Sequence, residues 1–280
     1  MTTSPTHPPT PAPTEYIFRT TDEELVRLGY QHRVWAEDAY AGWRRAGFAP
    51  GWRVIDLGSG PGFTTIDLAH LVGPTGAVLA IDESQKFLDH LMAVMVVEPL
   101  DNVTPLCANV TEFSAEPGAY DGANARWLMC FVDDPLKVAR RVAHALRPGG
   151  VWVIQDYSDY TGAGLWPESD AFRALLAAVE AHWRDGRGDP DVVAHLPAIL
   201  DTAGFDVAHT RPMVRTGRPG SALWMWPEVF FRSFGPVLVE EGGIEQATLD
   251  EFWRDWEERS HMGHAVFTSP PMTELIAVKR

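Results

Sequence analysis

The chain has 280 residues, 45% of them hydrophobic, which suits one domain of about 200 to 250 residues with an elaboration, or two small domains. Its formal net charge of -15 disfavours nucleic acid as a partner, because a phosphate backbone attracts surfaces rich in lysine and arginine. No run of about 18 apolar residues occurs, so the sequence predicts no membrane-spanning helix and no membrane partner.

The first segment, residues 1–14, is rich in threonine and proline and has neither the basic nor the apolar region of a signal peptide. It predicts a disordered tail and, by default, a cytoplasmic protein. Residues 15–50 carry apolar side chains at near-helical intervals, with an acidic helix start at Thr21–Glu24. They predict an N-terminal cap of helices.

The most informative stretch is Val54–Gly62, where a short apolar run ends in a turn with three alternating glycines. Residues 63–71 then predict a helix, because apolar side chains recur at helical spacing. Glycine lets a ligand approach the main chain, and the start of a helix offers unpaired N–H groups. The succession of strand, turn and helix therefore predicts a site for a nucleotide-like ligand.

The spacing of the glycines indicates which nucleotide. A dinucleotide-binding G-x-G-x-x-G motif would need its third glycine where this chain has Phe63. The pattern from Asp56 to Gly62, Asp-x-Gly-x-Gly-x-Gly, instead resembles the first motif of class I S-adenosylmethionine (SAM) dependent methyltransferases. Asp82 ends the next apolar run, where an acidic side chain can bind both ribose hydroxyls. NAD-binding folds use the same acidic residue, so Asp82 supports an adenosine without choosing between the cofactors.

Beyond Asp82 the pattern alternates between helix and strand, which predicts a parallel sheet with crossover helices on both faces. Arg147–Gly150, placed before an apolar strand, resembles a segment of many class I methyltransferases. We expect helices at 63–71, 87–97, 136–146, 169–184 and 189–203, and strands at 54–57, 77–82, 103–107, 120–128, 151–156, 204–214 and 274–279.

The resemblance covers residues 51–157 and implies an α/β fold with a Rossmann-like, mostly parallel sheet of seven strands, the last two paired as a hairpin. Aromatic helical sequence at 224–256 would lie between those two strands and form a lid over the acceptor side of the cleft. The expected organisation is a tail at 1–14, a helical cap at 15–50, a SAM-binding core at 51–215, a helical lid at 216–262 and a final core strand at 263–280.

The resemblance also implies which residues hold SAM. In an open α/β sheet the ligand lies beyond the carboxyl ends of the strands. Asn109 follows the third strand. In the family, the residue at this position, often an aspartate, bonds the adenine amino group, and an asparagine can do so through its carbonyl oxygen. The alternative role of Asn109 is to cap the turn. The expected cofactor-binding residues are Tyr16, Gln31, Asp56, Gly58, Ser59, Gly60, Gly62, Asp82, Asn109, Val110, Ala125 and Arg126.

Methyl transfer from SAM, which leaves S-adenosylhomocysteine (SAH), is an in-line displacement at an activated methyl group. The protein mainly aligns donor and acceptor and excludes water. A general base helps acceptors that lose a proton, and the candidates are His32, Asp156, Tyr157, Tyr160, His261 and His264, of which we select the first three. No metal is expected, because Asp156 alone matches poorly the clustered ligands of metal-dependent catechol-type enzymes. The tryptophan-rich lid predicts a small hydrophobic or aromatic acceptor, with a cationic one as the alternative.

The leading hypothesis is therefore a metal-independent, SAM-dependent methyltransferase acting on a small molecule, with a homodimer as a candidate assembly. Two other functions stay open. One is an NAD(P)-dependent oxidoreductase, against which Phe63 argues, and the other is a SAM-binding protein without turnover. Cys107 and Cys130 lie in apolar strand-like runs and predict buried, reduced thiols.

Overall fold

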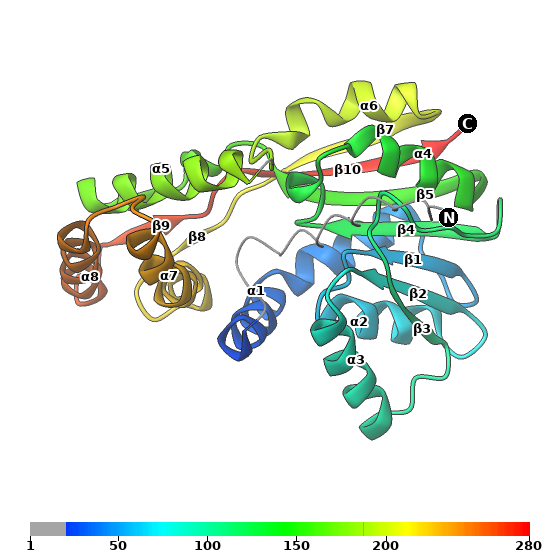
Figure 1. Cartoon of the computed structure of the whole chain (residues 1–280), viewed down its shortest axis with the longest axis horizontal. Coiled ribbons are helices and arrows are strands. Elements are labelled where there is room, and N and C mark those ends of the chain that lie inside the picture. Colours follow the sequence, from blue (N-terminus) through cyan, green and yellow to red (C-terminus); the bar gives the residue numbers. More distant parts are fainter. Residues whose placement is uncertain (1–20, 187) are drawn as a thin grey trace, which may run out of the picture.

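The computed structural model describes residues 21–186 and 188–280. Its centre is a seven-stranded sheet with the order β3-β2-β1-β4-β5-β10-β7 (Figure 1). β10 runs antiparallel to its neighbours β5 and β7, and the other neighbouring pairs are parallel. The strands are β1 (Arg53–Leu57), β2 (Ala77–Asp82), β3 (Val103–Cys107), β4 (Tyr120–Arg126), β5 (Leu146–Tyr157), β7 (Phe205–Met213) and β10 (Met272–Lys279). The predicted mostly parallel sheet of seven strands and its closing hairpin are confirmed.

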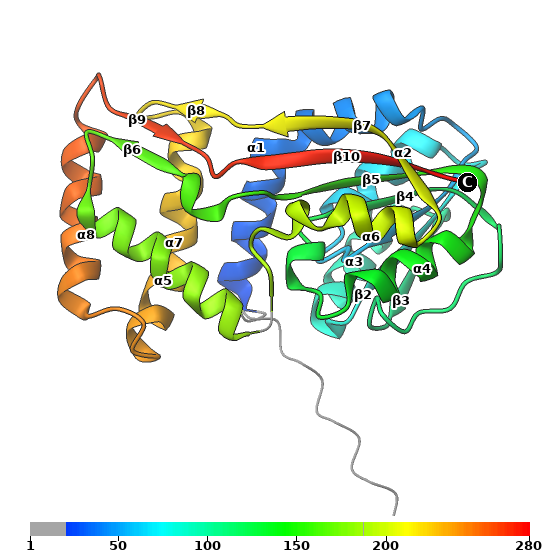
Figure 2. The same cartoon turned by 90° about the horizontal axis from the view of Figure 1, so that it is seen from above.

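Helices cover both faces of this sheet (Figure 2). α1, α2 and α3 pack on one face, and α4 and α6 pack on the other, each over its own apolar cluster. Right-handed crossovers between parallel strands place successive helices in this way. These helices are α1 (Asp22–Ala46), α2 (Phe63–Val72), α3 (Gln85–Val97), α4 (Pro135–Ala145) and α6 (Leu196–Thr202), with short 3-10 turns η1 (Met129–Phe131) and η3 (Val192–Ala194).

Several element boundaries differ from the sequence-based prediction, and for three of them the structure gives a physical reason. β4 ends at Arg126 because the next residue, Trp127, has a positive φ of 51° that extended backbone does not allow. β5 begins at Leu146, and a register shift opposite β4 accommodates the extra residues 147–150. The helix expected over 189–203 is a 3-10 turn followed by α6, since Pro197 lies in the first turn of α6, where a missing N–H is tolerated.

A second group of elements extends from the end of the sheet, on the left of Figure 1. It combines three helices with a small antiparallel sheet of order β6-β9-β8, whose two- and three-residue strands are too short for a sequence pattern to reveal. Its elements are η2 (Tyr160–Gly162), β6 (Gly164–Trp166), α5 (Asp170–Asp185), β8 (Thr216–Gly217), α7 (Ala222–Glu240), α8 (Gln246–Ser260) and β9 (Val266–Thr268). α7 and α8 are the helices predicted between the last two core strands.

A buried carboxylate fastens α1 to the sheet. Glu274 on β10 is fully buried, and its Oε1 accepts from Arg45 Nε at 2.9 Å and Nη2 at 2.7 Å. Its Oε2 accepts from Gln155 Nε2 at 2.8 Å. A Cβ atom on Gly42 would lie 2.5 Å from that oxygen, so the glycine lets the helix approach the carboxylate. This polar cluster therefore adds to the apolar packing that holds α1 over the sheet.

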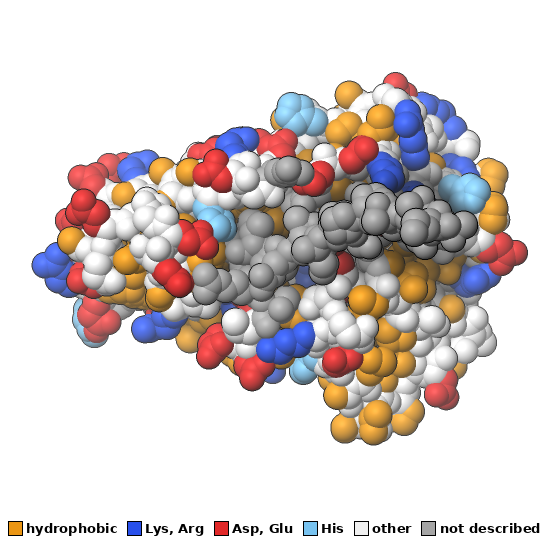
Figure 3. All heavy atoms as spheres, in the orientation of Figure 1, with side chains coloured by type: hydrophobic (Ala, Val, Ile, Leu, Met, Phe, Trp, Pro, Cys, Tyr) orange, Lys and Arg blue, Asp and Glu red, His pale blue; other side chains and the backbone are white. Residues whose placement is uncertain are grey.

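Apolar side chains gather on the surface of α3, at the lower right of Figure 3. They include Met92, Val96 and Val97, of which the last is 86% exposed.

The two cysteines differ in exposure. Cys130 is buried as predicted, whereas Cys107 is exposed, so the prediction of a buried thiol was wrong for Cys107. The reason is that Cys107 ends β3, which is an edge strand of the sheet. Within the described residues, every helix is too short or too polar to cross a membrane.

Candidate active site

The glycine turn after β1 is built for close approach. Gly58, Gly60 and Gly62 all have positive φ, at 62°, 53° and 90°. A Cβ atom would lie 2.7 Å from Leu128 Cδ1 if added to Gly58, and 2.5 Å from Leu91 Cδ1 if added to Gly62. At Gly60 no atom of the described residues is recorded within 4 Å of that position. Two of the glycines thus allow packing against neighbouring elements, whereas the described residues leave space beside the middle one.

Asp82, at the carboxyl end of β2, lies beside this turn. Its Oδ2 accepts from the Gly60 N–H at 2.8 Å, and its Oδ1 accepts from the Ser84 N–H at 2.9 Å. Burial raises the pKa of the carboxyl group, while these two backbone hydrogen bonds act in the opposite direction. A carboxylate has about four acceptor positions, so both oxygens can still accept from a ligand.

The turn, Asp82 and the carboxyl ends of β3 and β4 surround a cleft of about 710 Å³. This is the place where ligands bind in open α/β sheets. The sequence-predicted residues that line the cleft are Gln31, His32, Gly58, Ser59, Gly60, Asp82, Asn109, Val110 and Arg126. Segments far apart in the chain therefore converge on one cavity.

Other predicted residues do not line the cleft. Asp56 is buried beneath it, where Oδ2 accepts from Thr65 Oγ1 at 2.7 Å and Oδ1 from Asn124 Nδ2 at 2.8 Å; burial raises its pKa to about 6. Ala125 is fully buried in the apolar core, and Gly62 packs against α3. Tyr16 lies outside the described residues. Asp56 thus supports the end of β1 from below.

Asp156 is also buried beneath the rim. Its carboxylate accepts from the backbone N–H groups of Leu128 at 3.1 Å, Cys130 at 3.3 Å and Tyr157 at 2.9 Å. Burial raises its pKa to about 6. These contacts hold the segment after β4 in place. Because its oxygens accept from the backbone and it is not among the residues that line the cleft, Asp156 is unsuited to the role of a general base.

His32 on α1 is held at both ring nitrogens. Arg126 Nη2 lies 2.9 Å from Nδ1, and Asp67 Oδ2 lies 3.1 Å from Nε2. A guanidinium can only donate, so Nδ1 accepts and Nε2 carries the proton that faces the carboxylate. The imidazole then has no free lone pair with which to accept a proton. His32 is therefore better suited to positioning Arg126 than to acting as a general base.

Arg126, at the end of β4, is a buried cation in the wall of the cleft. Nη2 also donates to Thr64 Oγ1 at 2.8 Å, and burial lowers the pKa of the guanidinium to about 10. Nη1 is buried and has no hydrogen-bond partner in residues 21–186 and 188–280, and the same holds for Oγ of Ser59 in the glycine turn. Two unsatisfied polar atoms at one end of the cleft indicate a polar ligand there.

At the other end of the cleft, Asn109 forms a turn of its own. Its Oδ1 accepts from the Thr111 N–H at 2.8 Å and from Thr111 Oγ1 at 2.7 Å, and Nδ2 donates to Glu83 Oε2 at 3.1 Å. The turn-capping role is thus present, and the amide and Glu83 together face the cavity. Burial raises the pKa of Glu83. The sequence-based prediction missed Glu83 as a residue of the site, although it directly follows Asp82.

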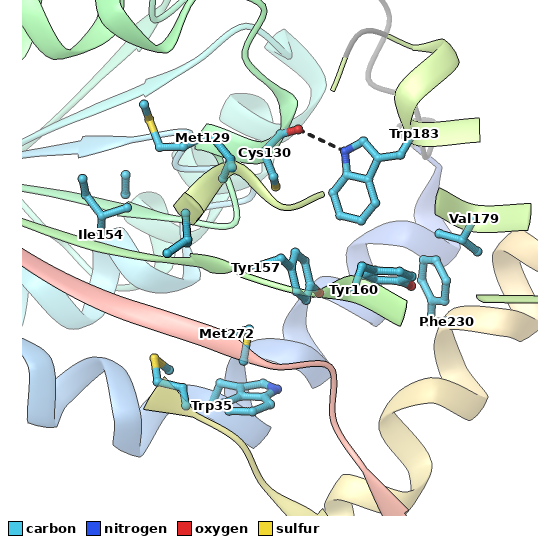
Figure 4. Close-up of a cluster of buried hydrophobic side chains, with 14 of the residues drawn as sticks. Trp35, Met129, Cys130, Ile154, Tyr157, Tyr160, Val179, Trp183, Phe230 and Met272 are labelled. Carbon is cyan, nitrogen blue, oxygen red and sulfur yellow. Dashed lines mark hydrogen bonds between the residues drawn. The ribbon is translucent and has the colours of Figure 1, made fainter. Parts of the chain in front are cut away.

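A second cavity, of about 50 Å³, adjoins the cleft, with which it shares the lining residues Gln31, Trp127 and Phe131. Its walls are mainly aromatic, and Figure 4 shows Tyr157, Tyr160, Trp183 and Phe230 gathered at this place. The remaining lining residues are Arg27, Ala163, Phe172, Leu176, Trp226, Pro227, Phe231, Phe267 and Pro270. We call it the aromatic cavity.

Of the three selected catalytic candidates, Tyr157 lines the aromatic cavity, as does Tyr160 from the wider set of candidate bases. Burial raises the pKa of the Tyr157 phenol well above the usual value, so it keeps its proton at neutral pH. The sequence-based prediction missed Arg27 and Trp226, which also line this cavity. Arg27 could have been noticed because it precedes Gln31 by one helical turn, whereas Trp226 comes from the distant α7.

Comparisons with known proteins agree with this geometry. Residues 54–150 match a family model described as a methyltransferase domain. The chain is 30% identical over 120 residues to a demethylmenaquinone methyltransferase of Lactococcus lactis, an alignment that covers 43% of the chain and 46% of that protein. It is 34% identical over 175 residues to an uncharacterized 37.1 kDa protein in transposon TN4556 of Streptomyces fradiae, which covers 62% of the chain and 49% of that protein.

Among solved structures, a SAM dependent methyltransferase from Aquifex aeolicus has a TM-score of 0.54 and 16% sequence identity, covering 93% of this chain and 100% of that one. This likeness concerns the fold. The chain spans about half the length of the two curated relatives. The matched domain, the strand order and the glycine turn together identify residues 54–150 as a methyltransferase domain within a Rossmann-like methyltransferase fold.

Proposed function

We propose that this protein transfers a methyl group from SAM to a small hydrophobic or aromatic molecule. The observation that carries the proposal is the open corner between Gly60 and Asp82, which faces a cleft that joins an aromatic cavity. One compartment would hold the cofactor and the other the acceptor. The matched methyltransferase domain favours SAM over NAD(P), as does Phe63 in the place of a third motif glycine.

The cleft offers matching groups for each part of SAM. Asp82 would accept from the ribose hydroxyls, and Asn109 with Val110 would lie along the adenine. Arg126 Nη1 and Ser59 Oγ would bind the carboxylate of the methionine tail, since both are unsatisfied polar atoms next to the glycine turn. When bound, SAM supplies the activated methyl group.

The residues of this chain contribute mainly alignment and exclusion of water. His32 and Asp156 have their acceptor atoms engaged by other protein groups, so we assign them positioning roles. Tyr157 is the residue among the three selected bases that we place next to the acceptor. A metal-independent reaction on an acceptor that needs little base catalysis follows from this proposal.

The name of one relative supports a class of acceptor. The Lactococcus lactis protein is a demethylmenaquinone methyltransferase, and a quinone-like ring would suit a cavity walled by aromatic side chains. We therefore place a flat, ring-shaped acceptor ahead of an aliphatic one. The homodimer and the cytoplasmic location stay predictions.

Calorimetry with SAM and SAH tests the cofactor, followed by a search for methylated product after incubation with SAM and a set of ring-shaped acceptors. We expect binding of both nucleotides and transfer to at least one acceptor. No binding of SAM or SAH at millimolar concentration would overturn the proposal. Tight binding without product from any acceptor would favour a SAM-binding protein without turnover.

Replacing Arg126 by methionine is expected to weaken SAH binding about tenfold, because the carboxylate of the ligand loses one charge-assisted hydrogen bond. Affinity for 5′-methylthioadenosine, which lacks the amino-acid tail, should stay within about twofold of wild type. Arg140→Met is the matched control, since Arg140 is exposed on α4 and does not line the cleft. An equal loss for both ligands would place the carboxylate elsewhere.

A further inference from the structure

Gln31 lies where the two cavities meet, since it lines both together with Trp127 and Phe131. Its Oε1 accepts from Arg27 Nη1 at 2.8 Å and from Trp226 Nε1 at 3.1 Å. Guanidinium and indole nitrogens only donate, so these contacts fix the orientation of the amide. Its oxygen faces the two donors, and its nitrogen faces away from them.

The Nε2 group of Gln31 has no hydrogen-bond partner among the described residues. The side chain as a whole is only 6% exposed. An N–H donor that is held rigidly and nearly buried costs stability unless something accepts from it. At this position the available acceptor is a ligand that reaches from the cleft into the aromatic cavity.

Two phenols add donors to the same cavity. Tyr157 and Tyr160 both line it, and neither hydroxyl bonds to another residue of the described chain. Burial raises the pKa of both phenols, so they stay protonated and can donate. The two rings meet edge to face at 5.2 Å, and each contacts the Trp183 ring (Figure 4).

The charges around the cavity disfavour a cationic occupant. None of the described lining residues is an aspartate or a glutamate. The one lining cation, Arg27, is paired with Glu24, to which Nε and Nη2 each donate at 2.6 Å. An amine would thus find rings but no carboxylate, and an oxygen would find several donors.

We propose that the acceptor is an aromatic ring that carries a hydroxyl group, with the ring in the aromatic cavity and the oxygen bonded by Gln31 Nε2 at the neck between the cavities. This inference rests on the proposed methyl transfer and names the substrate class. The aromatic cavity measures about 50 Å³, whereas a cavity that holds a benzene ring measures ~150 Å³. One small ring therefore enters only when the lining side chains move apart, and the rest of the molecule extends into the cleft.

The reaction balances without a further reactant. The acceptor oxygen, or the ring carbon beside it, forms a bond to the methyl carbon, and the bond from sulfur to that carbon breaks with its electron pair left on sulfur. The proton of the O–H or C–H group leaves to water in the open cleft. Donation by Gln31 favours the ionised oxygen, which makes the acceptor more nucleophilic.

Three probes test this proposal: 2-naphthol, naphthalene and 2-(aminomethyl)naphthalene. Each probe is titrated into the SAH-saturated full chain, and its binding is followed by the change in tryptophan fluorescence. In the wild type we expect 2-naphthol to bind about tenfold more tightly than either of the others. Gln31→Glu still accepts from Arg27 and Trp226 but replaces the N–H donor by an acceptor oxygen. It should abolish the preference for 2-naphthol over naphthalene and raise the affinity for the amine.

Gln246→Glu, at an exposed glutamine on α8, is the matched control and should keep the wild-type preference. Tyr160→Phe should reduce the preference for 2-naphthol in part, by about threefold. The inference is overturned if the wild type prefers the amine or naphthalene, or if it gives no saturable signal with 2-naphthol. It is also overturned if the preference for 2-naphthol survives in Gln31→Glu. Since SAH binding is measured first on the same sample, failure there identifies failure of the proposed function instead.

Discussion

Replacing Asp82 by alanine is expected to weaken the binding of SAM and SAH by ~1.5 to 3 kcal/mol, roughly 10- to 150-fold, the scale of hydrogen bonds to a charged group. The carboxylate lines the cleft at the end of β2, where the Gly60 and Ser84 N–H groups hold it in place. Its remaining acceptor positions face the ribose hydroxyls in our proposal. Isothermal titration calorimetry with SAH measures the loss.

Part of that loss could come from the glycine turn, because the substitution also removes the acceptor of the Gly60 N–H. A 2′,3′-dideoxy analogue of SAH separates the two effects. It should bind the wild type more weakly than SAH does, whereas the Asp82→Ala variant should not distinguish the two ligands. If the variant keeps the full preference for SAH, the ribose is bound by other residues.

Truncation of Glu274 to alanine is expected to lower the free energy of unfolding by about 3 kcal/mol. The carboxylate is completely buried, and its removal leaves Arg45 without this acceptor and Gln155 Nε2 with the Asp38 carbonyl at 3.1 Å as its remaining acceptor among the described residues. Arg45 itself is about a third exposed, so water can still solvate part of its guanidinium group in the variant. The expected loss of stability therefore lies at the lower end of the range for a broken buried ion pair. Urea denaturation followed by circular dichroism measures the change.

Glu257→Ala provides the comparison, because this glutamate is 75% exposed and pairs only with His261 on the same helix. Its effect should stay within about 0.5 kcal/mol. Glu274→Gln keeps one carbonyl oxygen and should lose less than Glu274→Ala. A Glu274→Ala variant as stable as the wild type would mean that apolar packing alone holds α1 on the sheet.

Much of the fold could be predicted because its signals are local. The three glycines, the acidic end of β2 and the apolar runs each occupy a few consecutive residues, and the order of helices and strands follows from them. The short strands β6, β8 and β9 could not be predicted, since pairing between distant segments defines them.

The candidate site was harder to predict, because a strand buried on both faces gives no alternating pattern. Asp56 and Asp156 both end predicted strands, yet their side chains turn beneath the rim and bond protein groups. Arg126, also at a strand end, turns into the cleft. The sequence places such residues at the correct edge of the sheet but does not show which way each one points.

α1 is one continuous helix of 25 residues, roughly 37 Å long. Its carboxyl-terminal part is fastened to β10 through Arg45 and Glu274, while the Tyr30 hydroxyl donates to the Ala222 carbonyl of α7 at 2.7 Å. A stiff rod fixed at two such points transmits small rotations along its whole length. Sequence changes around Gly42, which touch neither ligand, would therefore alter the affinities for cofactor and acceptor together, and natural variation there could tune the enzyme without altering its specificity.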